Sequence, residues 1–565
     1  MVQKVWLSSY PAGMPAEIAV TPFSSLSDLV EDAIRRFGDK PAFSNLGHSM
    51  SFPELGRLSR NFTAFLQSLS NLNRGDRVAI MLPNLLQYPV VLFGILRAGL
   101  TVVNVNPLYT PRELEFQLKD SGAKAIIILE NFAHTLQKVL PNTEIKHVIS
   151  TQLGDLLPAP KRWIVNTIVK RVKHMVPRWR IDGALPLRQA LACGSRAEPK
   201  PVKVEHKDIA FLQYTGGTTG VAKGAMLTQH NMLANLEQTN LWISGSFREG
   251  QEIAIAPLPM YHIFCLTSTL AFLKLGCQTV LITNPRDLPA FVKELRRWKF
   301  SVLTGVNTLF NALMNTPGFD KLDFSALKVA VGGGASVQKS VAERWQKITG
   351  SFLTEAYGLT ETSPGVCCTP LGTPWNGTIG LPVSSTEVSI RDEEFNELPL
   401  WNGEGNIEKC TGEICVRGPQ VMLGYWNSEE ETRKTLQDGW LKTGDIGHMD
   451  SKGYITITDR KKDMILVSGF NVYPNEIESV LMTHPGVAEC AVVGVPDARS
   501  GEAVRLVVVR EDPNLSEEEI LAFCKTQFTG YKRPHHVDFR DHLPKTPVGK
   551  ILRRELREET KDSKD

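Results

Sequence analysis

The chain has 565 residues, of which 42% are hydrophobic and 22% charged, and its formal net charge is +3 at pH 7. This length exceeds what one hydrophobic core usually serves, so we expect two or more domains. The composition excludes a disordered chain, and the small net charge excludes a protein whose overall field attracts nucleic acid.

The cysteine pattern and the lengths of the apolar segments indicate the cellular compartment of the protein. The nine cysteines include no C-x-x-C pair, which favours reduced thiols in the cytoplasm over a disulfide framework or a zinc site. The apolar run near the amino terminus is too short for a signal peptide, and the windows at 88–96 and 263–273 are too short to span a bilayer. A cytoplasmic protein is expected.

An amphipathic helix is the first predicted element, at residues 26–37. Apolar residues recur there at helical spacing after Ser25, a favoured N-cap residue, and stop before Gly38. Short apolar runs at 78–82, 124–129, 253–256, 278–283 and 328–331 follow, separated by helix-length segments. They are typical of buried strands. The sequence therefore predicts an α/β fold with mixed, largely parallel sheets.

The segment 161–180 is strongly basic. It holds seven Lys or Arg and no acidic residue, with Ile164, Ile168, Val172 and Met175 on one predicted helical stripe and Pro177 as the stop. Such a helix suits an anionic membrane surface. A solvated helix that covers the core with its apolar stripe is equally compatible with the pattern.

A Gly/Thr-rich loop at 214–225 carries the clearest chemical signal. Its glycines let backbone N–H groups face an anion, its threonines add hydroxyl donors, and Lys223 adds a positive charge. A Walker A loop would have Gly before the lysine and Ser or Thr after it, whereas Ala222 and Gly224 stand there. The loop predicts a phosphate site of another kind, with a plain surface loop as the alternative.

Near the carboxyl end the pattern changes. Runs rich in β-formers at 489–495 and 503–509 precede a charged helix at 516–526. We therefore expect a small α+β domain from about residue 463 onward.

Further motifs occur in a fixed order along the chain. They are Pro257–His262, Val331–Ala335, Tyr357–Glu361, Trp440–Asp445, Asp459–Asp463 and Pro544–Lys550. Together with the 214–225 loop they resemble the adenylate-forming superfamily over about residues 23–554, and residues 438–462 resemble the signature of fatty acyl-CoA synthetases. Met449, Asp450 and Thr456 depart from that signature, which bears on chain length and not on reaction class.

The resemblance implies a domain plan and two chemical steps. An N-terminal adenylation domain would span 1–459 and a mobile C-terminal domain 463–565, joined by a hinge at 460–462 that includes Lys462. A long-chain fatty acid and ATP would give acyl-AMP and PPi, and CoA would then give acyl-CoA and AMP, feeding fatty acid degradation. Rotation of the small domain would separate the two steps.

Site roles are implied position by position. Nucleotide contacts would come from Tyr214, Thr215, Gly216, Gly217, Thr218, Thr219, Gly220, Lys223, Gly333, Gly334, Ala335, Tyr357, Gly358, Thr360, Asp445 and Arg460. Glu361 and Thr215 would hold Mg²⁺ against the phosphates. A helix-start carboxylate, a turn aspartate and a core tyrosine are the structural alternatives for Glu361, Asp445 and Tyr357.

Four residues are expected to be catalytic: Lys550, His262, Lys223 and Arg460. Lys550 would neutralise the acyl carboxylate and α-phosphate in the first step, and His262 would close the carboxylate pocket. Ser468, Gly469 and Phe470 would face CoA in the second. Residues 260–266 contain no acid to pair an amino group, which favours an apolar acyl chain.

Several alternatives stay open at this point. One is a ligase for medium-chain or aromatic acids, one is a fatty acyl-AMP ligase that loads a carrier protein, and one is a nucleotide-binding membrane scaffold without activity. The expected partners are fatty acid, ATP and CoA, without nucleic acid. The basic segment would place the protein peripherally on the inner face of the cell membrane. A homodimer is neither favoured nor excluded.

Overall fold

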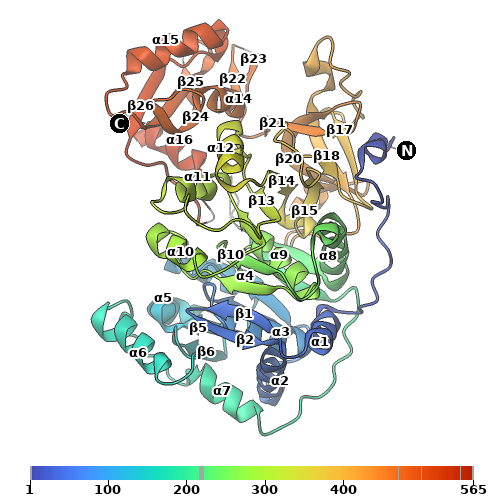
Figure 1. Ribbon diagram of the computed structural model, residues 1–565, viewed down its shortest axis with the longest axis vertical. Coiled ribbons are helices and arrows are strands. Elements are labelled where there is room, and N and C mark those ends of the chain that lie inside the picture. Colours follow the sequence, from blue (N-terminus) through green and yellow to red (C-terminus); the bar gives the residue numbers. More distant parts are fainter. Residues whose placement is uncertain (1–2, 216–221, 469, 498, 548, 563–565) are drawn as a thin grey trace.

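The computed structural model describes residues 3–215, 222–468, 470–497, 499–547 and 549–562. A large N-terminal body built on three sheets carries a small C-terminal α+β domain (Figure 1). The predicted α/β class is confirmed. Six residues predicted to contact nucleotide or CoA lie outside the described residues: Gly216, Gly217, Thr218, Thr219, Gly220 and Gly469.

A seven-stranded sheet forms the first layer. Its order is β7-β6-β5-β3-β4-β8-β9, parallel except for the antiparallel β8–β9 hairpin. The strands are β3 (Arg77–Met81), β4 (Thr101–Asn104), β5 (Ala125–Leu129), β6 (His147–Thr151), β7 (Leu185–Pro186), β8 (Ile209–Thr215) and β9 (Lys223–Thr228). β8 and β9 therefore bring the two ends of the Gly/Thr loop side by side.

A nine-stranded sheet lies beside it. Its order is β16-β15-β14-β13-β12-β10-β11-β1-β2, parallel in its centre and antiparallel at both ends. The strands are β1 (Pro41–Asn45), β2 (His48–Ser51), β10 (Ile253–Ala256), β11 (Gln278–Leu281), β12 (Val302–Gly305), β13 (Val329–Gly333), β14 (Leu353–Gly358), β15 (Gly365–Cys368) and β16 (Leu381–Pro382). The predicted strands of both sheets are confirmed to within two residues at most ends.

Helices cover these sheets and fill the space between them. They are α1 (Leu26–Phe37), α2 (Phe52–Ser68), α3 (Gln87–Arg97), α4 (Pro111–Ser121), α5 (Ala133–Val139), α7 (Leu187–Gly194), α8 (Gln229–Ile243), α9 (Ile263–Lys274), α10 (Leu288–Leu295), α11 (Asn307–Asn315) and α12 (Lys339–Thr349), with short turns η2 (Glu130–Phe132), η3 (Leu140–Asn142), η5 (Ser244–Ser246) and η6 (Thr360–Thr362). In α1, Ser25 accepts a hydrogen bond from the N–H of Asp28 and Gly38 ends the helix, as predicted.

A third, five-stranded sheet completes the N-terminal body. It consists of β17 (Glu387–Arg391), β18 (Gly412–Arg417), β19 (Leu436–Gln437), β20 (Trp440–Met449) and β21 (Ile455–Arg460), with α13 (Glu429–Thr435) and η7 (Ile407–Cys410) in its connections. The amino-terminal turn η1 (Val5–Ser9) packs beside it, where Trp6 is buried and Ser9 donates to Lys452 O at 2.7 Å.

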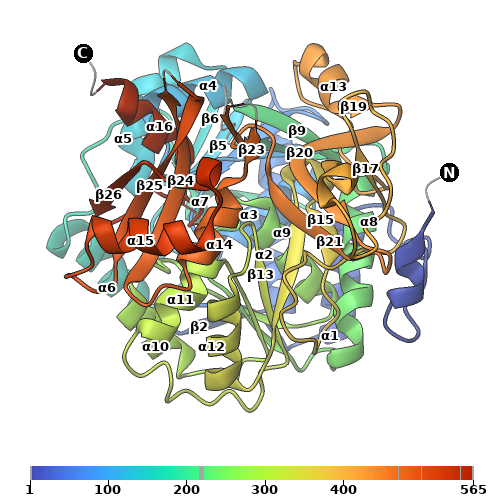
Figure 2. The same ribbon diagram turned by 90° about the horizontal axis from the view of Figure 1, so that it is seen from above.

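The C-terminal domain has a core of its own. Its sheet contains β22 (Ile465–Val467), β23 (Phe470–Val472), β24 (Val487–Asp497), β25 (Gly501–Arg510) and β26 (His536–Arg540), covered by α14 (Pro474–Leu481), η8 (Gly530–Lys532), α15 (Glu517–Gln527) and α16 (Arg553–Asp562). Seen from above, this domain lies over α11 and beside the third sheet (Figure 2). The predicted helix at 516–526 is confirmed, with Ser516 as its N-cap.

The basic segment differs from its prediction. The α-helix α6 (Lys161–Thr167) continues only as a π-helical turn, η4 (Ile168–Val172), and His174 then adopts φ 49°. A π-turn breaks the 3.6-residue repeat, so the expected stripe does not continue as one helix to Pro177. None of the helices within the described ranges is long and apolar enough to span a membrane.

Candidate functional site

The end of the third sheet positions the first group of predicted residues. Asp445 on β20 and Arg460 on β21 are direct cross-strand partners, and the Arg460 Nε lies 3.1 Å from Asp445 Oδ1. The Tyr357 hydroxyl, at the end of β14, donates to Asp445 Oδ2 at 2.6 Å. Burial and the Asp445 charge raise the pKa of Tyr357 well above its usual value, so the phenol stays a donor. Asp445 is only 3% exposed.

Lys550 reaches this group from the C-terminal domain. Burial, together with the positive charge of Arg460, lowers the pKa of Lys550 to about 7. Its neighbour Gly549 is docked on the N-terminal body, where the Thr308 hydroxyl donates to Gly549 O at 3.2 Å. Gly549 has φ 84°, and a Cβ there would lie 2.7 Å from Thr308 Oγ1. The turn thus needs glycine for both conformation and space.

His262, from the N-terminal body, lies close enough to Lys550 to be affected by its charge. It is the N-cap of α9 and accepts the N–H of Phe264 through Nδ1 at 3.4 Å. Burial, together with the charge of Lys550, lowers the pKa of His262 to about 4. The imidazole is therefore neutral at physiological pH and sits beside a cation. The structure brings His262, Lys550, Arg460, Asp445 and Tyr357 together around one point.

The glycines after β13 adjoin the same region. A Cβ on Gly333 would lie 3.1 Å from the ring of Phe264 and 3.0 Å from Ala356 O, and Gly334 has φ 74°. A Cβ on Gly358 would lie 2.0 Å from Pro364 O. Gly333 and Gly358 therefore permit close backbone approach, and Ala335 continues the turn that leads to α12. Thr360 lies in η6.

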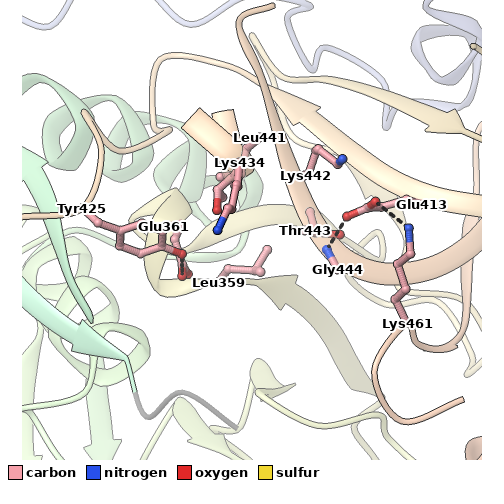
Figure 3. Close-up of a pocket in the computed structure, with 11 residues that line it drawn as sticks. Leu359, Glu361, Glu413, Tyr425, Lys434, Leu441, Lys442, Thr443, Gly444 and Lys461 are labelled. Atoms are coloured by element: carbon pink, nitrogen blue, oxygen red, sulfur yellow. Dashed lines mark hydrogen bonds and ion pairs between the residues drawn. The ribbon is translucent and has the colours of Figure 1, made fainter. Parts of the chain in front are cut away.

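A polar pocket of about 340 Å³ opens beside these residues (Figure 3). Its lining comes from η6, β18, α13, β20 and the connections beside them: Leu359, Glu361, Glu413, Tyr425, Lys434, Thr435, Leu441, Lys442, Thr443, Gly444 and Lys461. A second hollow of about 270 Å³ continues past Gly444 to Asp445, Arg460 and Lys462. The two share Thr443, Gly444 and Lys461 and so form one polar trough next to the Asp445 group.

Glu361 and Lys223 meet at the pocket wall through Tyr425. The Tyr425 hydroxyl donates to Glu361 Oε1 at 2.6 Å, and the Lys223 ammonium lies 5.3 Å from the centre of the Tyr425 ring and pairs with Glu431. Thr215 is the cross-strand partner of Lys223. No cation pairs with Glu361 among the residues described, so one carboxylate oxygen is available to a metal. Mg²⁺ commonly binds one or two carboxylates plus substrate phosphates, and this donor set fits it.

Tyr214 lies at the start of the Gly/Thr loop. It is 8% exposed, its hydroxyl donates to Asp120 Oδ2 at 2.5 Å, and Gly224 packs against its ring. These contacts join β8, β9 and the end of α4 and support the strand that leads into the loop. The nucleotide contact expected of Tyr214 stays a prediction.

The residues expected to face CoA are not part of this constellation. Ser468, at φ 51°, donates its N–H to Ser500 O at 2.7 Å, and Phe470 stacks on Tyr531 with ring centres 4.7 Å apart. Both belong to the C-terminal domain, and Phe470 is 56% exposed. In the orientation described, Lys550 interacts with the site, whereas the contacts given above for Ser468 and Phe470 lie within the C-terminal domain.

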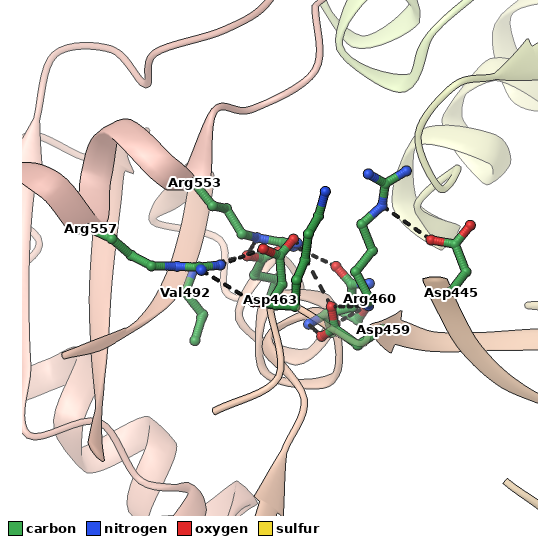
Figure 4. Close-up of polar contacts among 11 residues, drawn as sticks. Asp445, Asp459, Arg460, Asp463, Val492, Arg553 and Arg557 are labelled. Atoms are coloured by element: carbon green, nitrogen blue, oxygen red, sulfur yellow. Dashed lines mark hydrogen bonds and ion pairs between the residues drawn. The ribbon is translucent and has the colours of Figure 1, made fainter. Parts of the chain in front are cut away.

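A cluster of ion pairs surrounds the expected hinge (Figure 4). Arg553 pairs with Glu478 at 2.6 Å and Asp463 at 3.3 Å, and lies 3.9 Å from Asp459. Asp459 Oδ2 accepts the N–H of Asn475 at 2.8 Å. Asp459 precedes the expected hinge in the sequence, whereas its partners Arg553 and Asn475 follow that hinge. These contacts therefore link the two domains. Burial raises the pKa of Asp459 to about 6.

The sequence motifs predicted no role for this ion-pair cluster, for Tyr425 or for Glu431. Asp459 is the first residue of the motif Asp459–Asp463. An acidic residue directly before three basic ones was the only sequence pattern that could have indicated an ion-pair role for it. The basic residue Arg553 stands beyond every quoted motif, and only the fold shows where it lies.

Comparison with known proteins places this geometry in a family. The model of the AMP-binding enzyme family matches residues 30–426, and that of the AMP-binding enzyme C-terminal domain matches residues 476–550. The long-chain-fatty-acid–CoA ligase of Escherichia coli O6:H1 is 55% identical over 566 residues, covering 100% of each chain.

Two solved structures share the fold. An anthranilate CoA ligase in complex with anthranoyl-AMP aligns with a TM-score of 0.84 at 24% identity, covering 96% of this chain and 98% of its own. ATP-bound MatB from Rhodopseudomonas palustris aligns with a TM-score of 0.78 at 28% identity, covering 95% and 100%. With both domain models matched in order and a full-length relative at this identity, the chain belongs to the AMP-binding enzymes, the adenylate-forming superfamily.

Proposed function

We propose that this protein is a long-chain fatty acid:CoA ligase that forms acyl-AMP and then acyl-CoA. The observation that carries the proposal is the full-length 55% identity to a long-chain-fatty-acid–CoA ligase. It is supported by the convergence of Lys550, Arg460 and His262 beside a polar trough. The product would feed fatty acid degradation.

In the first step a carboxylate oxygen attacks the α-phosphorus of ATP and PPi leaves. Both reactants are anions, so their charges must be neutralised before they meet. Lys550 and Arg460 supply two positive charges next to Asp445, whose buried carboxylate offers acceptors to the ribose hydroxyls. Neutral His262 would close the carboxylate side without adding charge, and Tyr357 would offer its ring to adenine.

The phosphate side would be formed by Lys223, Thr215 and the loop between them. Glu361 and Thr215 would hold Mg²⁺, which supplies charge neutralisation at the phosphate oxygens when bound. Lys223 now pairs with Glu431 at the pocket rim. An incoming triphosphate would compete with that carboxylate for the ammonium.

In the second step the CoA thiol attacks the acyl carbon and AMP leaves. Ser468 and Phe470 bond within the C-terminal domain in the present orientation, and we propose that the small domain turns about residues 460–462 for this step, with Lys462 as the pivot. Lys550 would leave as Ser468 and Phe470 arrive. Residues 1–459 and 463–565 are the two bodies that we propose to move.

A direct assay tests the function. Purified protein with Mg²⁺, ATP and hexadecanoate should form acyl-AMP and PPi, and added CoA should convert it to acyl-CoA and AMP. Octanoate, benzoate and an acyl carrier protein are the comparison substrates. Higher kcat/KM with any of these than with hexadecanoate and CoA would overturn the substrate assignment, and absence of acyl-AMP with every acid would overturn the reaction.

We further propose that residues 161–175 touch an anionic membrane surface. Trp163, Ile164, Val172 and Met175 are 60%, 54%, 67% and 54% exposed, and the segment lies on the outer side of the N-terminal body, away from the C-terminal domain (Figure 1). Apolar side chains among basic ones bind such surfaces, with roughly 1 kcal/mol from each Lys or Arg near it. The protein would then lie peripherally at the cytoplasmic face.

Liposome sedimentation tests the membrane contact. Wild-type protein should bind phosphatidylglycerol vesicles more tightly than neutral ones, and Trp163→Ser with Val172→Ser should remove the preference. Leu423→Ser is the control, because Leu423 is equally exposed, at 59%, outside this segment. Equal weak binding of wild-type protein to both vesicle types would refute the contact.

A further inference from the structure

The loop that carries His262 is held by side chains from the neighbouring sheet. Residues 257–261 join β10 of the nine-stranded sheet to α9, and their backbone groups bond to Asn84, Tyr88 and Gln213. All three belong to the seven-stranded layer. Gln213 lies on β8, Asn84 in the loop between β3 and α3, and Tyr88 in the first turn of α3. The contacts therefore cross between the two large sheets directly beneath the site.

Asn84 binds the loop at three backbone atoms. Its Nδ2 donates to Ala256 O at 3.0 Å and to Leu258 O at 2.8 Å, and its Oδ1 accepts the N–H of Met260 at 2.8 Å. Asn84 is 2% exposed. One buried amide thus fixes the path of the loop from the end of β10 to two residues before His262.

A second chain of buried polar groups fixes the last part of the loop. The Tyr88 hydroxyl lies 2.9 Å from Met260 O and 2.5 Å from Asn104 Oδ1, and Asn104 Nδ2 donates to Gln213 Oε1 at 2.9 Å. Gln213 Nε2 in turn donates to Tyr261 O at 2.7 Å. The amide of Gln213 is the final link and ends one residue from His262.

Gln213 also belongs to the phosphate side of the site. It lies on β8 two residues before Thr215, the cross-strand partner of Lys223. Its backbone is therefore part of the strand that leads into the Gly/Thr loop, while its side chain holds the loop of His262. A single residue spans the two halves of the site that must approach for carboxylate attack on phosphorus.

We propose that Gln213 is a positioning residue that sets the separation between the acyl-carboxylate loop and the phosphate loop, with Asn84 fixing the carboxylate loop against the same layer. This inference rests on the proposed function. The network is fully buried and uncharged, and satisfied buried amides specify a single arrangement. Attack geometry is sensitive to displacements of about 1 Å, so loss of the Gln213 amide should reduce the rate of adenylation more than it weakens ATP binding.

The proposal is tested with the variant Gln213→Met, and Gln87→Met is its control. Gln87 is a matched control because it is 1% exposed and its Nε2 donates to a backbone carbonyl, Gln152 O at 2.8 Å, outside the 257–261 loop. Measurements are ATP/PPi exchange, acyl transfer from supplied acyl-AMP to CoA, and Tm.

We expect Gln213→Met to lower kcat of ATP/PPi exchange at least tenfold with KM for ATP within about threefold of wild type. Transfer from acyl-AMP should stay within about threefold, because no phosphate bond forms in that step. Gln87→Met should keep kcat within about twofold at a similar change in Tm. Equal losses in both variants, or in both half-reactions, would overturn the proposal.

Gln213→Glu is the second test variant, to be used if Gln213→Met does not fold. Glutamate keeps the acceptor for Asn104, and only its protonated form can donate to Tyr261 O; burial raises the pKa of such a carboxyl. Its ATP/PPi exchange rate relative to wild type should rise at least threefold from pH 8 to pH 6, and a flat ratio would contradict the inference. If wild-type protein makes no acyl-AMP, the proposed function fails instead, so the two failures are distinguishable.

Discussion

The loop that carries His262 and the junction that carries Lys550 are held in different ways. Uncharged buried amides bind the loop through Asn84 and Gln213, whereas carboxylates and guanidinium groups bind the junction through Asp459 and Arg553. Amides deep in a core have no water to replace a lost partner, whereas ion pairs at a domain boundary can be rehydrated when the bodies separate. The domain motion proposed above accounts for this difference, with the loop of His262 as the fixed half of the site and the junction of Lys550 as the moving half.

The largest effect is expected from Lys550→Ala, which removes the charge contributed by the moving half. ATP/PPi exchange should fall roughly 10³-fold, the loss typical of one electrostatic group at a reacting centre. Transfer from supplied acyl-AMP to CoA should change by less than about threefold. Lys545→Ala is the control, since Lys545 lies on the same turn and pairs with Glu489. Equal loss of both half-reactions would remove the distinction between the halves.

Asp445→Ala should have the next largest effect, because it breaks the fixed half where Tyr357 and Arg460 converge. Hydrogen bonds to a charged group contribute about 1.5–3 kcal/mol, so kcat/KM for ATP should fall about 10²-fold. Asp450→Ala is the control: the Asp450 carboxylate accepts the N–H groups of Lys452 and Tyr454 and lines neither hollow, so this variant should stay within about twofold. Steady-state kinetics with varied ATP measures both, and similar losses in the two variants would contradict the assignment.

Asp459→Ala should loosen the junction, and it also removes the acceptor for the backbone N–H of Arg460 at 2.7 Å. The Asn475 N–H and Arg553 lose a partner across the proposed hinge, and an unsatisfied buried donor costs about 1–3 kcal/mol. Adenylation should fall about tenfold, and trypsin should cut after Lys461 or Lys462 faster than in wild type. Asp538→Ala, which breaks an ion pair with Arg505 inside the C-terminal domain, is the control. Unchanged proteolysis would show that this cluster does not hold the domains.

A smaller effect is expected from pH. The pKa of Lys550 is about 7, so the charged form needed for adenylation dominates below that value and is lost above it. The kcat/KM for ATP/PPi exchange reports the free enzyme and should fall about fivefold from pH 7 to pH 8. Lys550→Arg should be flat over that range because a guanidinium does not titrate there. His262, with a pKa of about 4, adds no further change. If kcat/KM fell equally with pH in wild type and in Lys550→Arg, a group other than Lys550 would be responsible for the pH dependence.

Sequence patterns predicted the fold well where one local signal decided the structure. Ser25 and Gly38 delimited α1, and apolar runs located β3, β5, β10, β11 and β13. The pattern failed at 161–177, where the apolar spacing continued but the backbone formed a π-turn and then φ 49° at His174. Spacing alone does not register such a break, because the residues involved are ordinary helix formers.

The site was predictable where motifs carried it and not where packing did. Asp445, Arg460, His262 and Lys550 stand in quoted motifs and meet in the structure. Asn84, Gln213 and Arg553 act through partners that lie between 48 and 176 residues away in the sequence. A lone amide or arginine has no local signature, so only the fold identifies its partners.

A disulfide between positions 308 and 549 would test most directly whether the small domain must move. A Cβ at Gly549 would adjoin the Thr308 side chain, so Thr308→Cys with Gly549→Cys can bridge the domains, in a Cys193→Ser background because Cys193 is exposed. Cysteine at φ 84° costs about 1–2 kcal/mol, so the reduced form of the same protein is the reference.

We expect the oxidised protein to form acyl-AMP as fast as its reduced form, to transfer the acyl group to CoA at least about twentyfold more slowly, and to recover on reduction. Equal acyl-CoA formation by the oxidised and reduced forms would contradict the account.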